Sequence, residues 1–174
     1  MTWKLLAPLA AVCMAWSPAS QAQPLSSPLD APPAAPLGSG PGFHSPQSPI
    51  PPLKERGDVV SWKLLGSVKT KVAGNRVEAQ FPQDVRALNQ RIVKIQGFMM
   101  PLEPGDRQKH FLLSAVPTTC AFCVPAGPQG LVEVKTRTPV RYSIDPVVVE
   151  GRFAVLDDDP YGIFYRIVDG VPSK

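Results

Sequence analysis

The sequence predicts a mainly β protein: a small, partly open β-barrel resembling the OB fold, with one short helix, preceded by a Pro-rich disordered tether. Three observations lead to this fold class. Apolar and polar residues alternate in several segments of the second half, only one short stretch has helical character, and Gly, Pro, Asn and Asp cluster between the segments. A chain of 174 residues that is 44% hydrophobic fits one modest domain and excludes a multidomain enzyme.

The N-terminal segment, residues 1–22, is predicted to be a secretory signal peptide. Lys4 supplies a positive start, a short apolar run follows, and the small residues Ser20 and Ala22 precede a cleavage site after Ala22. Cys13 lies inside the apolar run, so we do not expect it to carry a lipid anchor. The mature protein is therefore expected in the periplasm, without a transmembrane segment.

Residues 23–57 are predicted to be a disordered linker. Ten of the 22 prolines of the chain lie in this segment, and most of its other residues are Ala, Ser, Gly and Leu. Such a composition buries too little apolar surface to offset the entropy lost on ordering. We expect residues 58–174 to form the single β-rich domain.

Strand-like alternation runs through this domain. The alternating segments are residues 77–81, 91–100, 132–135, 147–155 and 163–167, and residues 110–116 form a more continuous apolar strand. Gly97 and Gly151 lie within two of these strands, where glycine permits the sharp bending that a small barrel needs. The one predicted helix covers residues 82–89, with Pro82 in its first turn. Trp62 is expected to close one end of the barrel.

The chemically informative motif is the pair Cys120 and Cys123. Two cysteines at this spacing can form a structural disulfide, bind a soft metal as thiolates, or exchange between thiol and disulfide. Val124 follows the second cysteine, which excludes haem attachment. An even number of cysteines in the mature chain fits an oxidising compartment. Phe122, between the two cysteines, is expected to pack against the domain.

A metal site would need further ligands, and His110 is the candidate third ligand. The other histidine, His44, lies in the predicted linker. Two thiolates and one imidazole suit Cu(I), whereas zinc would need an additional ligand. The acidic turn at residues 157–159 is expected to be solvated.

The sequence also excludes several functions. The formal net charge is +4, but the basic residues are scattered, and export would separate the chain from nucleic acid. No Gly-rich phosphate loop follows a strand, and no hydrolase constellation is present, so we expect no ordinary enzymatic activity.

The domain resembles a bacterial family of exported domains of unknown function, often described as lipoproteins. The resemblance is carried by residues 62–65, 93–102, 111–114, 120–128 and 132–134, with the signature G-F-M-x-P-L followed by C-x-F-C-x-P-x-G-P. Members are often encoded beside parts of export-type ABC transporters, in some cases linked to zinc supply. The resemblance therefore implies envelope ABC-transporter or metal-handling proteins as partners, and it carries over only Cys120 and Cys123 as candidate ligands.

These observations lead to one functional hypothesis and two alternatives. The first is an exported, non-enzymatic accessory domain that binds zinc or copper through Cys120 and Cys123, with His110 as an additional ligand, in support of envelope transport or metal handling. The second is a protein-interaction module of the cell envelope with a structural Cys120–Cys123 disulfide. The third is a thiol-disulfide exchange partner.

Overall fold

The computed structural model describes residues 41–73 and 76–174. The predicted signal peptide and the first part of the predicted linker, up to residue 40, lie outside the described residues. The chain divides into two units, residues 1–33 and 34–174, and every described residue belongs to the second.

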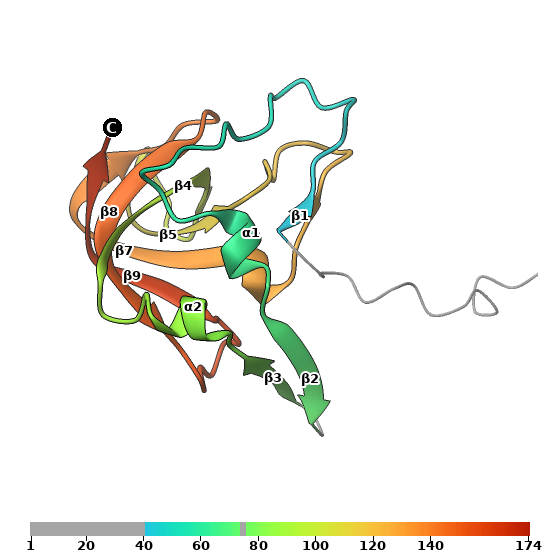
Figure 1. Cartoon of the computed structure of the whole chain (residues 1–174). Coiled ribbons are helices and arrows are strands. Elements are labelled where there is room, and N and C mark those ends of the chain that lie inside the picture. The colour runs from blue at the N-terminus through green and yellow to red at the C-terminus, as the bar shows by residue number, and fades with distance from the viewer. Residues whose placement is uncertain (1–40, 74–75) are drawn as a thin grey trace, which may run out of the picture. The chain divides into compact units, whose positions relative to one another are not determined.

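Five strands form a closed barrel in the order β4-β5-β7-β9-β8 (Figure 1). These are β4 (Ile92–Pro101), β5 (Arg107–Ser114), β7 (Leu131–Arg141), β8 (Val147–Val155) and β9 (Tyr165–Ser173). The pair β7–β9 is parallel, and the other four pairs are antiparallel. This Greek-key order with five strands is that of an OB-type barrel, so the predicted fold class is confirmed. The described barrel is closed, whereas the sequence suggested a partly open one.

The barrel core follows from the predicted alternation. Residues Val149, Gly151 and Phe153 of β8 point inward and are buried, while Arg152 between them is exposed. Aromatic side chains gather at one side of this core, where Phe153 stacks on Tyr165 with ring centroids 5.5 Å apart. Burial of such residues on facing strands is the main source of stability in a small barrel.

Gly151 has the tight environment predicted for a mid-strand glycine. A Cβ atom at this position would lie 2.9 Å from the carbonyl oxygen of Val168 on β9. The register between β8 and β9 also shifts between Glu150 and Arg152, which bends the strand at this point. Glycine therefore allows β8 to approach β9 closely at this point.

Two short α-helices accompany the barrel. The predicted helix exists as α2 (Gln83–Arg86), whose Val85 is fully buried. The second, α1 (Trp62–Leu65), was not predicted, because four residues are too few to show a helical period. Trp62 packs against the core and donates a 2.7 Å hydrogen bond from Nε1 to the Gln96 carbonyl. Leu65 is more deeply buried than Trp62, and its carbonyl accepts a 2.8 Å hydrogen bond from the Tyr165 hydroxyl.

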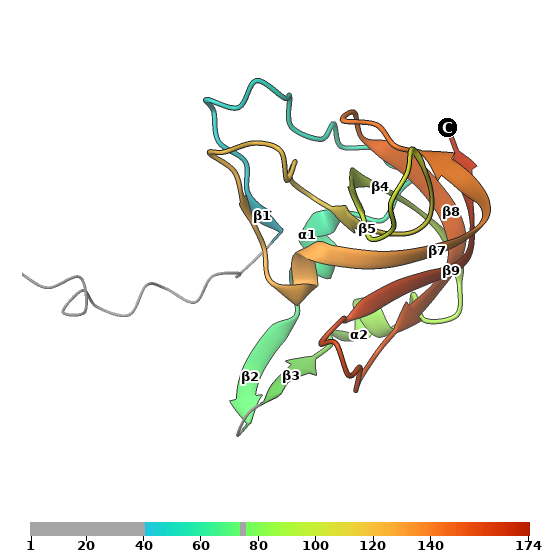
Figure 2. The same cartoon turned by 180° about the vertical axis from the view of Figure 1, so that it is seen from behind.

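Two small sheets lie outside the barrel. The hairpin of β2 (Lys69–Ala73) and β3 (Arg76–Gln80) connects α1 to α2, and β1 (Gly42–Phe43) pairs with β6 (Val124–Pro125). A short 3-10 helix, Pro128–Gly130, leads into β7. Strand β1 belongs to the segment predicted as linker, and its pairing with β6 places this part of the segment beside the cysteine loop (Figure 2).

Candidate functional site at the cysteine loop

The loop between β5 and β6 contains a disulfide between Cys120 and Cys123. Their Cα atoms are 5.3 Å apart, and the Cys123 amide donates a 3.2 Å hydrogen bond to the Cys120 carbonyl. The two cysteines are only 6% and 9% exposed, and with Val116 they form a small apolar cluster separate from the barrel core. This is the disulfide that the sequence left as one of three alternatives.

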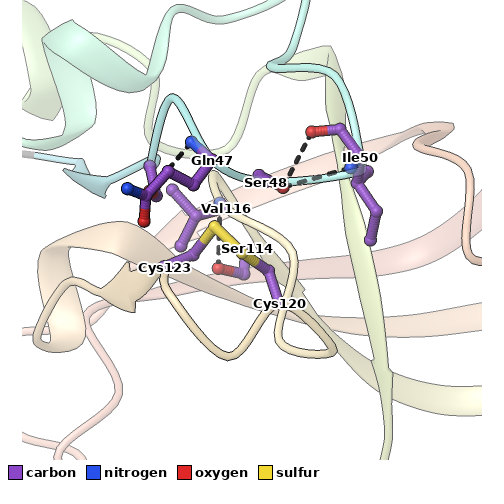
Figure 3. Close-up of a disulfide and its surroundings, with 8 residues drawn as sticks. Gln47, Ser48, Ile50, Ser114, Val116, Cys120 and Cys123 are labelled. Carbon is purple, nitrogen blue, oxygen red and sulfur yellow. Dashed lines mark hydrogen bonds between the residues drawn. A yellow bond between two sulfur atoms is a disulfide. The ribbon is translucent and has the colours of Figure 1, made fainter.

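A segment of the predicted linker lies beside this disulfide. Figure 3 shows Gln47 and Ser48 near Val116 and the two sulfur atoms, with Ile50 farther along the same segment. Serine side chains satisfy the backbone of this segment: the Gln47 amide donates to Ser45 Oγ at 3.1 Å, and the Ile50 amide donates to Ser48 Oγ at 3.1 Å. These turns hold the segment in place without a regular strand. The periodic patterns used to predict strands and helices do not reveal such turns.

Three apolar side chains remain exposed around the buried disulfide. Phe122 is 58% exposed, Phe43 on β1 is 57% exposed, and Val124 on β6 is 42% exposed. Phe43 and Val124 are direct partners in the β1–β6 register. The expectation that Phe122 packs against the domain is wrong: the tight turn closed by the disulfide buries the two cysteines and leaves the residue between them outside. We call Phe43, Phe122 and Val124 the loop patch.

The predicted third metal ligand, His110, is engaged elsewhere. Its Nε2 lies 2.7 Å from Glu133 Oε1 on the neighbouring strand β7. The Glu133 carboxylate also accepts a hydrogen bond from Arg166 of β9, and Lys135 Nζ lies 3.5 Å from its Oε1. Among the described residues, no group of three or more His, Cys, Asp or Glu side chains is placed to hold a metal ion. The disulfide and His110 therefore belong to two different arrangements.

Asp159 extends this second arrangement and corrects part of the expectation for the acidic turn. Its side chain is largely buried, accepts a 3.0 Å hydrogen bond from Arg166, and accepts backbone hydrogen bonds from Tyr161 and Ile163. Asp157, in contrast, is exposed and pairs with Arg86 of α2. We call His110, Glu133, Lys135, Asp159 and Arg166 the Glu133 cluster.

Both carboxyl groups of the Glu133 cluster are stabilised as anions. Burial raises the pKa of Glu133, but hydrogen bonds from Arg166 and His110 and the nearby positive charges outweigh it, so the pKa lies below the ordinary value. Burial likewise raises the pKa of Asp159, and its backbone hydrogen bonds and Arg166 more than compensate, so this pKa is lowered as well. The cluster thus ties β5, β7 and β9 together.

None of the helices in the described part of the chain has the length and apolar character needed to cross a bilayer.

Fold and loop together define a class: a small five-stranded Greek-key barrel that carries a disulfide-closed loop at one side. Residues 50–161 match the family described as "Protein of unknown function (DUF3299)", and the chain belongs to this family. All segments that carried the resemblance found in the sequence lie within this range, while the short signature itself stays a prediction.

The chain is also similar to one protein of solved structure. This is a crystal structure of a DUF3299 family protein from Pseudomonas aeruginosa, with 26% identity over 55% of this chain and 68% of the other, at a TM-score of 0.42. The comparison with curated proteins found no match.

Proposed function

We propose that the protein is an exported, non-enzymatic accessory module of the cell envelope that binds a partner protein through the loop patch. The observation that carries this proposal is the exposure of Phe43, Phe122 and Val124 around a disulfide that is itself buried. Of the alternatives that the sequence left open, the geometry of the loop favours the interaction module with a structural disulfide.

The disulfide contributes to binding by holding the loop in one conformation. A loop that is already rigid loses less conformational entropy when it binds. Aromatic side chains on a rigid support are the typical anchors of protein interfaces. Phe122 is held by its two neighbouring cysteines, and Phe43 is held by the pairing of β1 with β6.

Export to the periplasm remains part of the proposal. A disulfide is stable in an oxidising compartment, which supports this location. Mass spectrometry of the protein from its own cells is expected to find Gln23 at the N-terminus, and an intact Met1 or a lipid on Cys13 would contradict export with cleavage after Ala22. The resemblance to domains encoded beside ABC transporters makes an envelope transport or metal-handling protein the proposed partner.

Site-specific crosslinking tests the loop patch. A photoreactive phenylalanine analogue is placed at position 122, at position 43 or, as a matched control, at position 161, where Tyr161 is 88% exposed on the turn before β9. We expect the same envelope protein to be captured from positions 122 and 43 and not from position 161. Equal capture from all three positions, or none from the loop patch, contradicts the proposal.

Binding of a thiophilic metal is a second proposed function, and it requires reduction of the disulfide. The 5.3 Å separation of the Cα atoms would let two free thiolates converge on one ion, as Cu(I) accepts, and zinc would need further ligands. Because His110 is bonded to Glu133, we expect His110→Ala to leave the affinity of the reduced protein for Cu(I) and Zn(II) unchanged. Equal affinity in the reduced wild type and in Cys120→Ala with Cys123→Ala would end this proposal.

A further inference from the structure

A cleft of about 280 Å³ lies between the segment before α1 and the barrel, and nothing in the functions above uses it. The segment from β1 to α1 forms one wall, and the residues directly after β5, with Gln96 of β4, form the other. The side chains that matter here are those of His44, Leu53, Val60, Trp62, Ala115 and Val116. Most of them are apolar, and the volume is near the lower limit for small-molecule sites, so the cleft suits a small ligand.

One polar atom of a residue that lines this cleft lacks a partner. His44 Nε2 is buried, and no hydrogen-bond partner for it is found among the described residues. Buried polar groups in folded proteins are almost always hydrogen-bonded, and an exception calls for a missing water, ion or ligand. An imidazole Nε2 that carries its hydrogen can donate to an oxygen atom of a ligand.

The charged residues of the cleft leave one uncompensated positive charge. Arg56 is paired with Asp58 through hydrogen bonds of 2.9 and 2.7 Å. Lys54, Glu55 and Lys63 have no ion pair among the described residues. Two lysines and one glutamate together carry a single net positive charge, which matches a ligand with one negative charge.

We propose that this cleft binds a small monocarboxylate with an apolar tail. A turn of the His44 ring toward the cleft lets Nε2 donate a hydrogen bond to the carboxylate, which also faces Lys54 and Lys63 at the rim. The tail lies against Leu53, Trp62 and the remaining apolar lining. This site is distinct from the loop patch, so either proposal can fail while the other holds.

Octanoate is the probe, and 1-octanol is its matched neutral control. Titration calorimetry of the full chain is expected to show saturable binding of octanoate and at least about tenfold weaker binding of 1-octanol, the difference expected for one charge-assisted hydrogen bond. Trp62 supplies a local readout: in a chain that begins at Gln23, as the predicted cleavage would leave it, Trp62 is the remaining tryptophan, so its fluorescence should change with the same midpoint.

Variants locate the site. His44→Ala, and separately Lys54→Ala with Lys63→Ala, should each weaken octanoate binding at least about tenfold. Ala115→Phe should fill the cleft and abolish binding. The matched charge control, Lys109→Ala with Arg141→Ala, removes two exposed cations on β5 and β7 that do not line the cleft, and it should bind like the wild type.

Three results would each overturn this assignment: no binding of octanoate by the wild type, equal binding of octanoate and 1-octanol, or equal loss in the lysine variant and its charge control. The comparison of the two probes uses the unaltered protein, so it decides the question even if a variant fails to fold. Circular dichroism of each variant verifies the fold. Crosslinking from position 122 should be the same with and without octanoate, which keeps this test separate from that of the loop patch.

Discussion

The barrel and the cysteine loop are held in place by different means. The barrel buries a large cluster of apolar side chains, among them the fully buried Phe111, Phe153 and Tyr165, between five paired strands. The loop has a cluster of only three residues, Val116, Cys120 and Cys123, and a pairing of two residues on each side. Burial stabilises the barrel, whereas a covalent bond stabilises the loop.

Because of this difference, the residues that stabilise the protein and the residues proposed to bind a partner lie in different regions. A loop that contributes little to the core can expose Phe43 and Phe122 without weakening the fold. The disulfide replaces the apolar contacts that such a short loop cannot make, because it restricts the unfolded chain. The comparison predicts that substitutions lower the free energy of unfolding most in the barrel core, less at the disulfide and least at the loop patch.

The largest effect is expected in the barrel core. Phe111→Ala removes a fully buried ring from β5 and should lower the free energy of unfolding by about 3–5 kcal/mol, from lost burial and the cavity that remains. Urea denaturation followed by circular dichroism measures this change. A loss below about 1 kcal/mol would show that the barrel tolerates the cavity and would remove the contrast with the loop.

Removal of the disulfide should have a smaller and more local effect. For a closed loop of four residues, the chain-entropy estimate gives about 2 kcal/mol, so Cys120→Ala with Cys123→Ala is expected to stay folded. Limited proteolysis should then cut residues 41–57 and 117–127 faster than in the wild type, while the barrel remains resistant. An unfolded double variant would mean that the pair is required by the whole domain.

The barrel could be predicted from the sequence because its strands carry a clear signal. Val149, Gly151 and Phe153 alternate with polar or less buried residues, and a strand with one buried face requires this alternation. The predicted bounds of β8 agree with the structure, as do those of β4 within one residue at each end. Closure of the barrel was not predictable, because it depends on the parallel pairing of β7 with β9, which leaves no local pattern.

The site was less predictable, because it depends on contacts between distant segments. The cysteine spacing left a disulfide, a metal site and thiol exchange open, and it gave no sign that Gln47 and Ser48 lie beside the disulfide or that Phe122 is exposed. His110 was considered as a ligand because it lies on the strand that leads to the cysteines, whereas its partner Glu133 becomes a neighbour only through the pairing of β5 with β7. The sequence carried no signal for this ion pair, because Glu133 alternates with Val132 and Val134 as a solvent-facing residue would, and its burial is seen only in the structure.

The Glu133 cluster should give the barrel an acid dependence that the loop lacks. The pKa of Glu133 is lowered in the folded state, so its contribution to stability is present above the ordinary value of about 4.5 and is lost as the pH falls through the folded value. Glu133→Gln should therefore cost about 1 kcal/mol at pH 7, and the difference from the wild type should vanish in acid.

Denaturation at a series of pH values measures this difference. Asp159 has a pKa shifted in the same direction, so the Glu133→Gln protein should keep part of its acid sensitivity. Glu103→Gln, on the exposed turn between β4 and β5, is the matched control and should follow the wild type at every pH. A difference between wild type and Glu133→Gln that stays constant down to pH 2 would contradict a role for the charge of Glu133.

The smallest effect on stability is expected at the loop patch, where the effect on binding should be largest. Phe122→Ser replaces a 58% exposed ring that lies outside both apolar clusters, so the free energy of unfolding should change by less than about 0.5 kcal/mol. Association with the protein crosslinked from position 43 should nevertheless weaken at least about tenfold, as expected for the loss of an aromatic anchor. Tyr161→Ser, a change at a still more exposed aromatic residue on the turn before β9, should alter neither quantity. If Phe122→Ser destabilises the protein as much as loss of the disulfide does, the ring belongs to the packing of the loop, and the separation between a stabilising barrel and an interacting loop does not hold.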